Sequence, residues 1–156
     1  MCYSLYMASD RERPEVPWDE AKPAFYVNAS DPDAERARGQ FTKKKLYYLG
    51  SDEGCGCGFQ RENDWMSEDP KERDAKRENQ LRLASYLSSC LEDEDAIELY
   101  GCWSGGEEDE PVRTREIVVA DLRDEHFFFI ESERIVVKKK GDPVGTDNVG
   151  AARRRV

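Results

Sequence analysis

The chain has 156 residues, of which 37% are charged and 38% hydrophobic, and its net charge is −10. A chain of this length favours one domain with a core of its own. Its acidic surface repels phosphate groups, so we expect neither nucleic acid nor a membrane as a partner. No stretch approaches the roughly 20 apolar residues of a membrane span, and the N-terminus lacks the pattern of a signal peptide. We therefore expect a cytoplasmic protein.

Short apolar stretches separated by turn residues predict a series of strands. In chain order the expected strands cover residues 3–8, 24–27, 45–49, 96–103, 114–121 and 126–130, and residues 134–139 continue the last strand or pair with it. A short helix is expected from Pro32 to about Gln40. A longer one begins where Asp69 can cap it and Pro70 suits its first turn.

This longer helix is expected to reach residue 92, with one apolar stripe at three-and-four spacing. The stripe consists of Leu83, Tyr86, Leu87, Cys90 and Leu91. Because strands outnumber helices and the last strands follow one another closely, antiparallel pairing is favoured. The sequence therefore predicts a single α+β domain over residues 1–140, with one mostly antiparallel sheet of five to six strands and one long helix packed on a face. Residues 141–156 are expected to be a flexible C-terminal tail.

The chain contains five cysteines, an odd number that fits no closed framework of disulfides. In a reducing compartment such cysteines serve metal binding, redox chemistry or packing. Two of them lie in the stretch Gly54-Cys55-Gly56-Cys57-Gly58-Phe59, directly after an expected strand. Glycine permits the sharp bend that would turn both thiols inward. A disulfide between such close neighbours would be strained and easily reduced, which suits a transient role.

These features predict a cysteine-centred site that binds zinc or another thiophilic metal, or that carries out thiol redox chemistry. A zinc site needs about four ligands. We expect Cys55 and Cys57 to be joined by Cys102 and Cys2, which lie near strand ends. Cys90 is a poorer candidate because it belongs to the helical stripe, and His126, the only histidine, is more typical of a structural residue.

Other interpretations of these residues remain open. The glycines can form a tight turn in a non-catalytic interaction or structural domain, with the cysteines as small buried side chains. Asp52 and Glu53 have two opposed interpretations: they act as a general base or as ligands of a hard metal beside the thiols, or their charge raises the thiol pKa and makes the cysteines less reactive. If Met1 is removed, Cys2 becomes an N-terminal nucleophile, as in N-terminal-cysteine amidohydrolases. The spacing of the glycines does not match a dinucleotide-binding loop.

Three segments together resemble a group of small uncharacterised bacterial proteins. They are Cys2-Tyr3-Ser4-Leu5-Tyr6, the passage from Tyr47 to Phe59, and Tyr100-Gly101-Cys102-Trp103. The resemblance spans most of residues 1–135 and implies no activity. The partner of the expected site is a small molecule, a metal or a protein.

Overall fold

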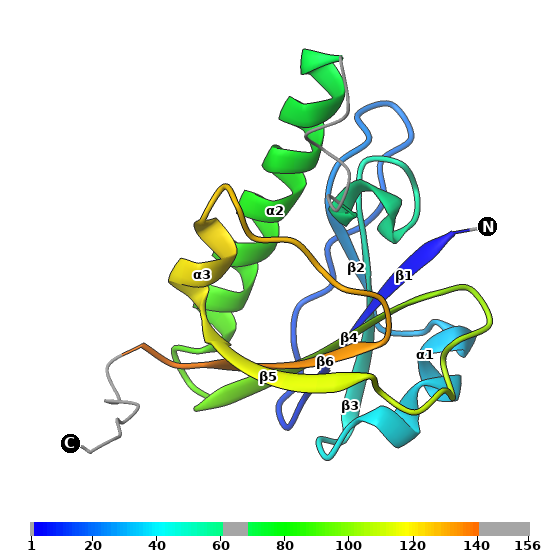
Figure 1. The fold of residues 1–156 in the computed structure, drawn as a ribbon, viewed down its shortest axis with the longest axis vertical. Helices are drawn as coiled ribbons and strands as arrows, with labels where there is room; N and C mark the ends of the chain where they lie inside the picture. The colour runs from blue at the N-terminus through cyan, green and yellow to red at the C-terminus, as the bar shows by residue number, and fades with distance from the viewer. Residues whose placement is uncertain (1, 61–68, 141–156) are drawn as a thin grey trace.

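The computed structural model describes residues 2–60 and 69–140, which form one six-stranded sheet with helices on its faces (Figure 1). The strands are β1 (Tyr3–Ser9), β2 (Tyr26–Asn28), β3 (Lys45–Gly50), β4 (Ala96–Trp103), β5 (Arg113–Val118) and β6 (Glu133–Lys138). The helices are α1 (Pro32–Arg36), α2 (Pro70–Cys90) and α3 (Val119–Arg123), with 3-10 turns η1 (Arg38–Gln40) and η2 (Gly56–Phe59).

The order of strands across the sheet is β2-β3-β1-β4-β6-β5. Every neighbouring pair is antiparallel except β5 and β6, which are parallel. β1 lies inside the sheet, and all seven of its residues are buried. The predicted α+β class, the mostly antiparallel sheet and the long helix on one face are confirmed.

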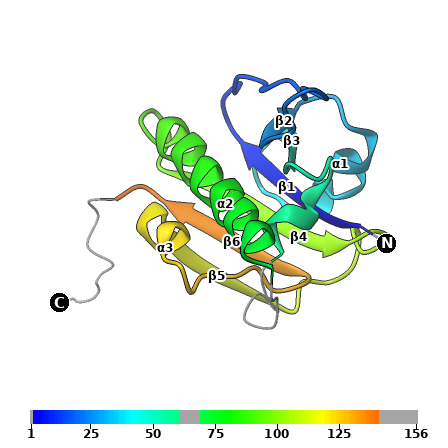
Figure 2. The same ribbon diagram turned by 90° about the horizontal axis from the view of Figure 1, so that it is seen from above.

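The two faces of the sheet are covered differently because successive side chains of a strand point to opposite sides. On one face α2 and α3 lie side by side across the strands (Figure 2), and this face holds the main core. Tyr3, Leu5 and Met7 of β1 point to this side. The other face carries α1 and a smaller core that includes Tyr6, Tyr100 and Cys102.

The long helix begins as the sequence predicts. The side chain of Asp69 accepts a hydrogen bond from the Lys71 N–H (2.9 Å), and Pro70 occupies the first turn. Leu83, Leu87 and Cys90 are buried against the sheet. The helix also buries two polar residues, Asn79 and Gln80, on this face. A purely apolar stripe was expected, so these two amides require partners within the protein.

Near the C-terminus one expected strand is confirmed over most of its length as β5, and another is wrong. The strand predicted over residues 114–121 ends at Val118, where α3 begins, and residues 126–130 form no strand. Phe129 is buried in the main core from an irregular segment, and the carbonyl of Phe128 accepts a hydrogen bond from Arg115 (3.1 Å). α3 and this segment form the crossover that a parallel pair of strands needs, which explains why β5 and β6 run in the same direction.

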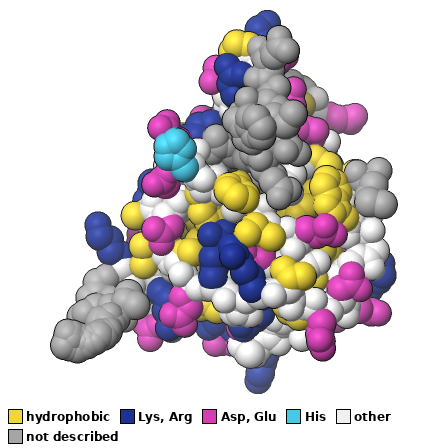
Figure 3. Space-filling model, viewed as in Figure 1, with side chains coloured by type: hydrophobic (Ala, Val, Ile, Leu, Met, Phe, Trp, Pro, Cys, Tyr) yellow, Lys and Arg dark blue, Asp and Glu magenta, His cyan; other side chains and the backbone are white. Residues whose placement is uncertain are grey.

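Charged side chains surround this core. Figure 3 shows acidic and basic groups interspersed over one face, with a group of Lys and Arg side chains near its centre. Among the helices in the described part of the chain, none combines the length and apolarity needed to cross a bilayer. The expected tail, residues 141–156, lies outside the described residues, and the cytoplasmic location stays a prediction.

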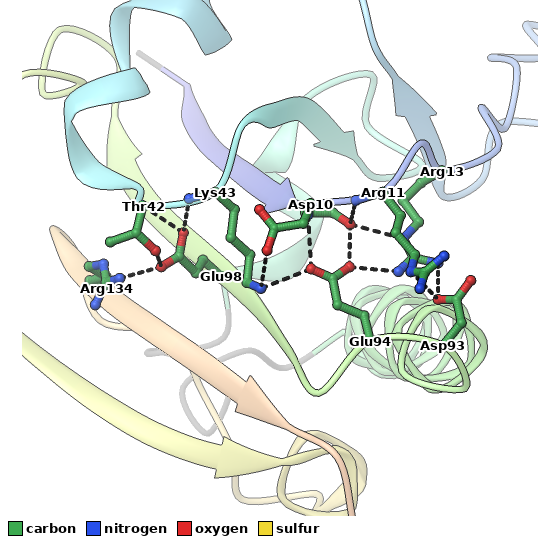
Figure 4. A network of polar contacts seen from close by, with 10 residues as sticks. Asp10, Arg11, Arg13, Thr42, Lys43, Asp93, Glu94, Glu98 and Arg134 are labelled. Atoms are coloured by element: carbon green, nitrogen blue, oxygen red, sulfur yellow. Dashed lines mark hydrogen bonds and ion pairs between the residues drawn. The ribbon is translucent and has the colours of Figure 1, made fainter.

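At the C-terminal end of β1, cations and carboxylates form a cluster of paired charges (Figure 4). We call it the charge cluster, and it consists of Asp10, Arg13, Lys43, Asp93 and Glu94. Glu94 is its centre, because Arg13 (2.6 Å) and Lys43 (2.8 Å) both bind its carboxylate. The cluster ties the loop after β1 to the segment between α2 and β4.

Candidate functional site: a three-cysteine cluster

The glycine-framed loop lies at the opposite, N-terminal end of β1. β3 pairs with β1 as far as Leu49, which faces Leu5, and the chain then leaves the sheet. The turn η2 takes the place of β3 beside the first residues of β1. The sheet edge that β3 vacates is therefore filled by the loop that carries Cys55 and Cys57.

Ser51 holds this loop in shape from inside. It is fully buried, and both its N–H (2.8 Å) and its hydroxyl (2.6 Å) donate to the carbonyl of Cys55. The same hydroxyl accepts hydrogen bonds from the N–H groups of Glu53 (3.2 Å) and Gly58 (3.0 Å). One side chain thus satisfies several backbone groups that have no partner in the sheet.

Asn79 of α2 supports the loop from the helix side. Its side-chain amide donates to the Asp52 carboxylate (2.8 Å) and to the Gly58 carbonyl (3.3 Å), and its oxygen accepts from the Asp52 N–H (3.2 Å). Asn79 is 2% exposed. The buried polar residue on the helix therefore positions the loop, and the Asp52 carboxylate is engaged with the helix.

Two of the glycines are required by the geometry. Gly54 has a φ of +82°, a conformation that other residues adopt at a cost. Gly56 lies so close to β1 that an added Cβ would be 2.6 Å from the Tyr3 carbonyl oxygen and 3.2 Å from the Ser4 Cα. Because these contacts are with backbone, the loop can approach β1 only where it has no side chain.

This packing brings together three cysteines that the sequence separates. The sulfurs of Cys2, Cys55 and Cys57 all lie within 4.8 Å of one another. Tetrahedral zinc with Zn–S bonds of about 2.3 Å holds its sulfurs roughly 3.8 Å apart, so small side-chain rotations would seat one ion. Cys55 and Cys57 are half-buried and Cys2 is exposed. We call these three residues the cysteine cluster.

Backbone N–H groups point at two of the sulfurs. The Tyr3 N–H donates to the Cys57 Sγ (3.3 Å), and the Cys57 N–H donates to the Cys55 Sγ (3.4 Å). Burial raises the pKa of the Cys55 thiol to about 12, and hydrogen bonds with the Cys57 and Cys2 side chains add to the rise. Burial is thus the main cause of the raised thiol pKa, whereas the sequence suggested the charges of Asp52 and Glu53 as the cause. The Cys55 thiol is protonated at neutral pH, so a metal must displace its proton.

The other candidate ligands lie elsewhere. Cys102 is fully buried in the smaller core with Tyr6 and Tyr100. Burial raises its thiol pKa to about 12, and Glu107 and Asp109 add to the rise. Across the strands Cys102 faces Ser4, two residues further along the chain than Cys2, and its sulfur does not belong to the group of three.

Cys90 is 3% exposed within the main core, as its place in the stripe predicts. His126 follows α3, and its side chain is 87% exposed. All five cysteines are free thiols. Cys2 as an N-terminal nucleophile stays a prediction, because Met1 lies outside the described residues.

An aromatic pair stands beside the cluster. The Tyr26 hydroxyl donates to the Gly54 carbonyl (2.7 Å), and its ring packs edge-on against Trp18, with centroids 5.1 Å apart. Trp18 is 39% exposed, and its ring lies 3.8 Å from the position that a Cβ at Gly54 would take. The cluster therefore has one apolar wall open to solvent.

Sequence reasoning did not assign roles to Ser51 and Asn79. A polar residue one helical turn before the stripe residue Leu83 is the signal that points to Asn79. No comparable signal identifies Ser51, since serine after a strand is common in ordinary turns.

No known protein family, curated protein or solved structure shows a significant match to this chain. The resemblance to small uncharacterised bacterial proteins stays a prediction.

Proposed function

We propose that this protein binds one thiophilic metal ion, with zinc the leading candidate, through the thiolates of Cys2, Cys55 and Cys57. The observation that carries the proposal is the convergence of three sulfurs from two distant segments. Soft thiolate ligands select zinc, copper(I) and related metals over magnesium or calcium.

The burial of the five thiols supports this assignment over a passive turn. Cysteines that serve as small hydrophobic side chains lie in the core, as Cys90 and Cys102 do. The three cluster cysteines are instead exposed or half-buried, and they face one another. A tight turn alone needs neither a second thiol in the loop nor a third at the start of β1.

The loop also contains the groups that a thiolate site uses around its ligands. The N–H groups of Tyr3 and Cys57 donate to sulfur, and such hydrogen bonds strengthen when the sulfur becomes negatively charged. Ser51 and Asn79 orient the loop from behind. In metal sites such supporting partners contribute a factor of about 10 to 100 in affinity.

The test is metal binding by protein purified without chelators, measured by elemental analysis and by competition with a chromophoric zinc chelator. We expect one metal ion per chain. Cys55→Ser and Cys57→Ser should each lower zinc affinity by about 100-fold or more, because each removes a ligand. Cys2→Ser should have a comparable effect.

Cys102→Ala and Cys90→Ala are the matched controls, since they remove thiols outside the cluster and should leave zinc affinity unchanged. Circular dichroism confirms that each variant is folded. The proposal fails if the wild-type protein takes up no zinc, copper(I) or cadmium, or if the control variants lose affinity as strongly as the cluster variants. A disulfide among the three cluster cysteines in metal-free protein, reversible by reductant, would instead support the thiol redox alternative.

A further inference from the structure

The cysteine cluster supplies three ligands, one fewer than a closed tetrahedral site requires. Among residues 2–60 and 69–140, no fourth His, Cys, Asp or Glu side chain joins the group. Cys102 is buried in the smaller core, and the Asp52 carboxylate accepts a hydrogen bond from Asn79. Within the described residues, the group therefore leaves one position of a tetrahedral site open.

The inner side of the cluster is closed by the protein itself. Cys57 packs against the main core, and its sulfur is held by the Tyr3 N–H. Gly56 rests directly on the backbone of β1. The exposed member is Cys2, on the outer side. A metal seated on the three sulfurs therefore has its remaining position toward solvent.

The loop that carries Cys55 and Cys57 has supporting contacts besides the three sulfurs. The loop is held by Ser51 and Asn79, and the core is built from side chains of the sheet and α2. Structural zinc sites are closed by four protein ligands and supply folding energy that the chain lacks without them. The cysteine cluster differs from such sites because it offers three ligands and because its loop has other supporting contacts.

Building on the proposed function, we infer that a thiolate from outside the chain occupies the fourth position, so that the cysteine cluster takes up and passes on its metal by ligand exchange. In the exchange step an external thiol loses its proton to solvent and forms a metal–sulfur bond, and a water molecule leaves. No electron is transferred. Stepwise replacement of the three cluster sulfurs by the acceptor's sulfurs, each cluster thiolate regaining a proton, then releases the metal.

The surroundings favour a particular class of thiol. The loop begins with Asp52 and Glu53 and contains no Lys or Arg before Gln60, and the whole chain has a charge of −10. Trp18 and Tyr26 provide an apolar surface for the carbon atoms of the incoming ligand. A thiol carried on a neutral or cationic molecule should therefore bind better than one flanked by carboxylates.

The experiment uses zinc-loaded or cadmium-loaded full-length protein and three thiols. Two are blocked tripeptides, Lys-Cys-Lys and Glu-Cys-Glu, which place opposite charges on either side of the same thiol, and the third is 2-mercaptoethanol. X-ray absorption spectroscopy counts the sulfur ligands, and native mass spectrometry detects a complex of protein, metal and thiol. We expect three sulfurs before addition and four after it, with one chain per metal.

Metal transfer to a chromophoric chelator should accelerate in proportion to the thiol concentration. At low ionic strength, and at equal thiolate concentrations, Lys-Cys-Lys should act about fivefold more strongly than Glu-Cys-Glu, and salt should reduce this difference. Capture of the tripeptides alone would identify a protein cysteine as the source of the thiolate. Capture of 2-mercaptoethanol as well would identify small thiols as sufficient.

The inference is overturned if the loaded protein already has four ligands from its own chain, if two chains share one metal, or if no thiol enters the coordination shell. In each of these cases metal is still bound and the proposed function stands. Absence of metal binding would instead overturn the proposed function itself. Cys102→Ala protein, which keeps the cluster, should behave as the wild type in every arm.

Discussion

The two ends of β1 carry different kinds of polar group: paired charges at one end and three neighbouring thiols at the other. At its C-terminal end the charge cluster satisfies its groups internally: the Glu94 carboxylate binds Arg13, Lys43 and the Ser9 hydroxyl (2.5 Å) (Figure 4). At its N-terminal end three sulfurs face one another without a counter-ion among them. Both groups are assembled from distant segments and lie against the same strand.

The difference separates polar groups that build the fold from polar groups that are available to a ligand. Burial alone would raise the pKa of the Glu94 carboxyl, but hydrogen bonds led by those from Lys43 and Ser9 lower it to about 2. The pKa of Cys55 moves the other way, to about 12, and burial is the main cause. In the charge cluster each charged group is paired with an opposite charge of the protein, whereas the three sulfurs of the cysteine cluster are free to bind a metal ion.

The largest loss of stability is expected from Glu94→Gln. The side chains of Glu94 and Arg13 are only 7% and 6% exposed, so this change leaves a buried cation without its main partner. Such a loss costs about 3–5 kcal/mol. Asp93→Asn is the control, because Asp93 also binds Arg13 but is 52% exposed, and its loss should cost about 1 kcal/mol or less. Urea unfolding measures the loss of stability in both variants. Equal losses would contradict the distinction between the buried Glu94 and the exposed Asp93.

Acid should weaken the charge cluster. The folded-state pKa of Glu94, about 2, lies below its ordinary value of 4.5, so its stabilisation is present above pH 4.5 and is lost as the pH falls toward 2. The loss amounts to up to about 3 kcal/mol. Urea unfolding at a series of pH values measures it. Below pH 4.5 the free energy of unfolding of the Glu94→Gln protein should fall less steeply with decreasing pH than that of the wild type. An unchanged pH dependence would contradict the assignment of this acid sensitivity to Glu94.

A smaller effect is expected from Gly56→Ala at the other end of β1. The added methyl group would press on the Tyr3 carbonyl and push the loop away from the strand. We expect a loss of about 1–3 kcal/mol together with weaker metal binding. Gly39→Ala is the control: it lies in η1, an added Cβ there would meet nothing within 4 Å, and both stability and zinc affinity should be kept. Calorimetry and zinc competition report the two quantities.

The smallest effect is expected from Tyr3→Phe. The Tyr3 hydroxyl is buried and has no hydrogen-bond partner among the described residues, so its removal should change stability by less than about 0.5 kcal/mol or increase it. Tyr6→Phe is the matched change on the opposite face. The Tyr6 hydroxyl donates to the buried Glu107 carboxylate (2.9 Å), and its loss should cost about 1–3 kcal/mol. Thermal unfolding compares the two, and a larger loss for Tyr3→Phe would contradict this reasoning.

Part of the candidate site could be predicted from sequence because its signal is local. The alternation of glycine and cysteine in residues 54–58 marks a bend with two thiols, and Cys2 lies at the start of an expected strand. The choice between Cys2 and Cys102 as partners was beyond the sequence. Both lie near strand ends, and only the packed structure shows that Cys102 is buried in the smaller core while Cys2 is exposed beside Cys55 and Cys57.

Local sequence patterns by themselves determined that α2 begins at Asp69-Pro70, that Cys90 is buried, and that the chain forms an α+β domain. These depend on caps, periodicity and strand propensity within a few residues. Only the tertiary structure decided the parallel pairing of β5 with β6, the support of the loop by Ser51 and Asn79, and the meeting of Cys2 with Cys55 and Cys57. Each of these requires segments tens of residues apart to share one edge or face, and that placement depends on how the whole sheet packs against its helices.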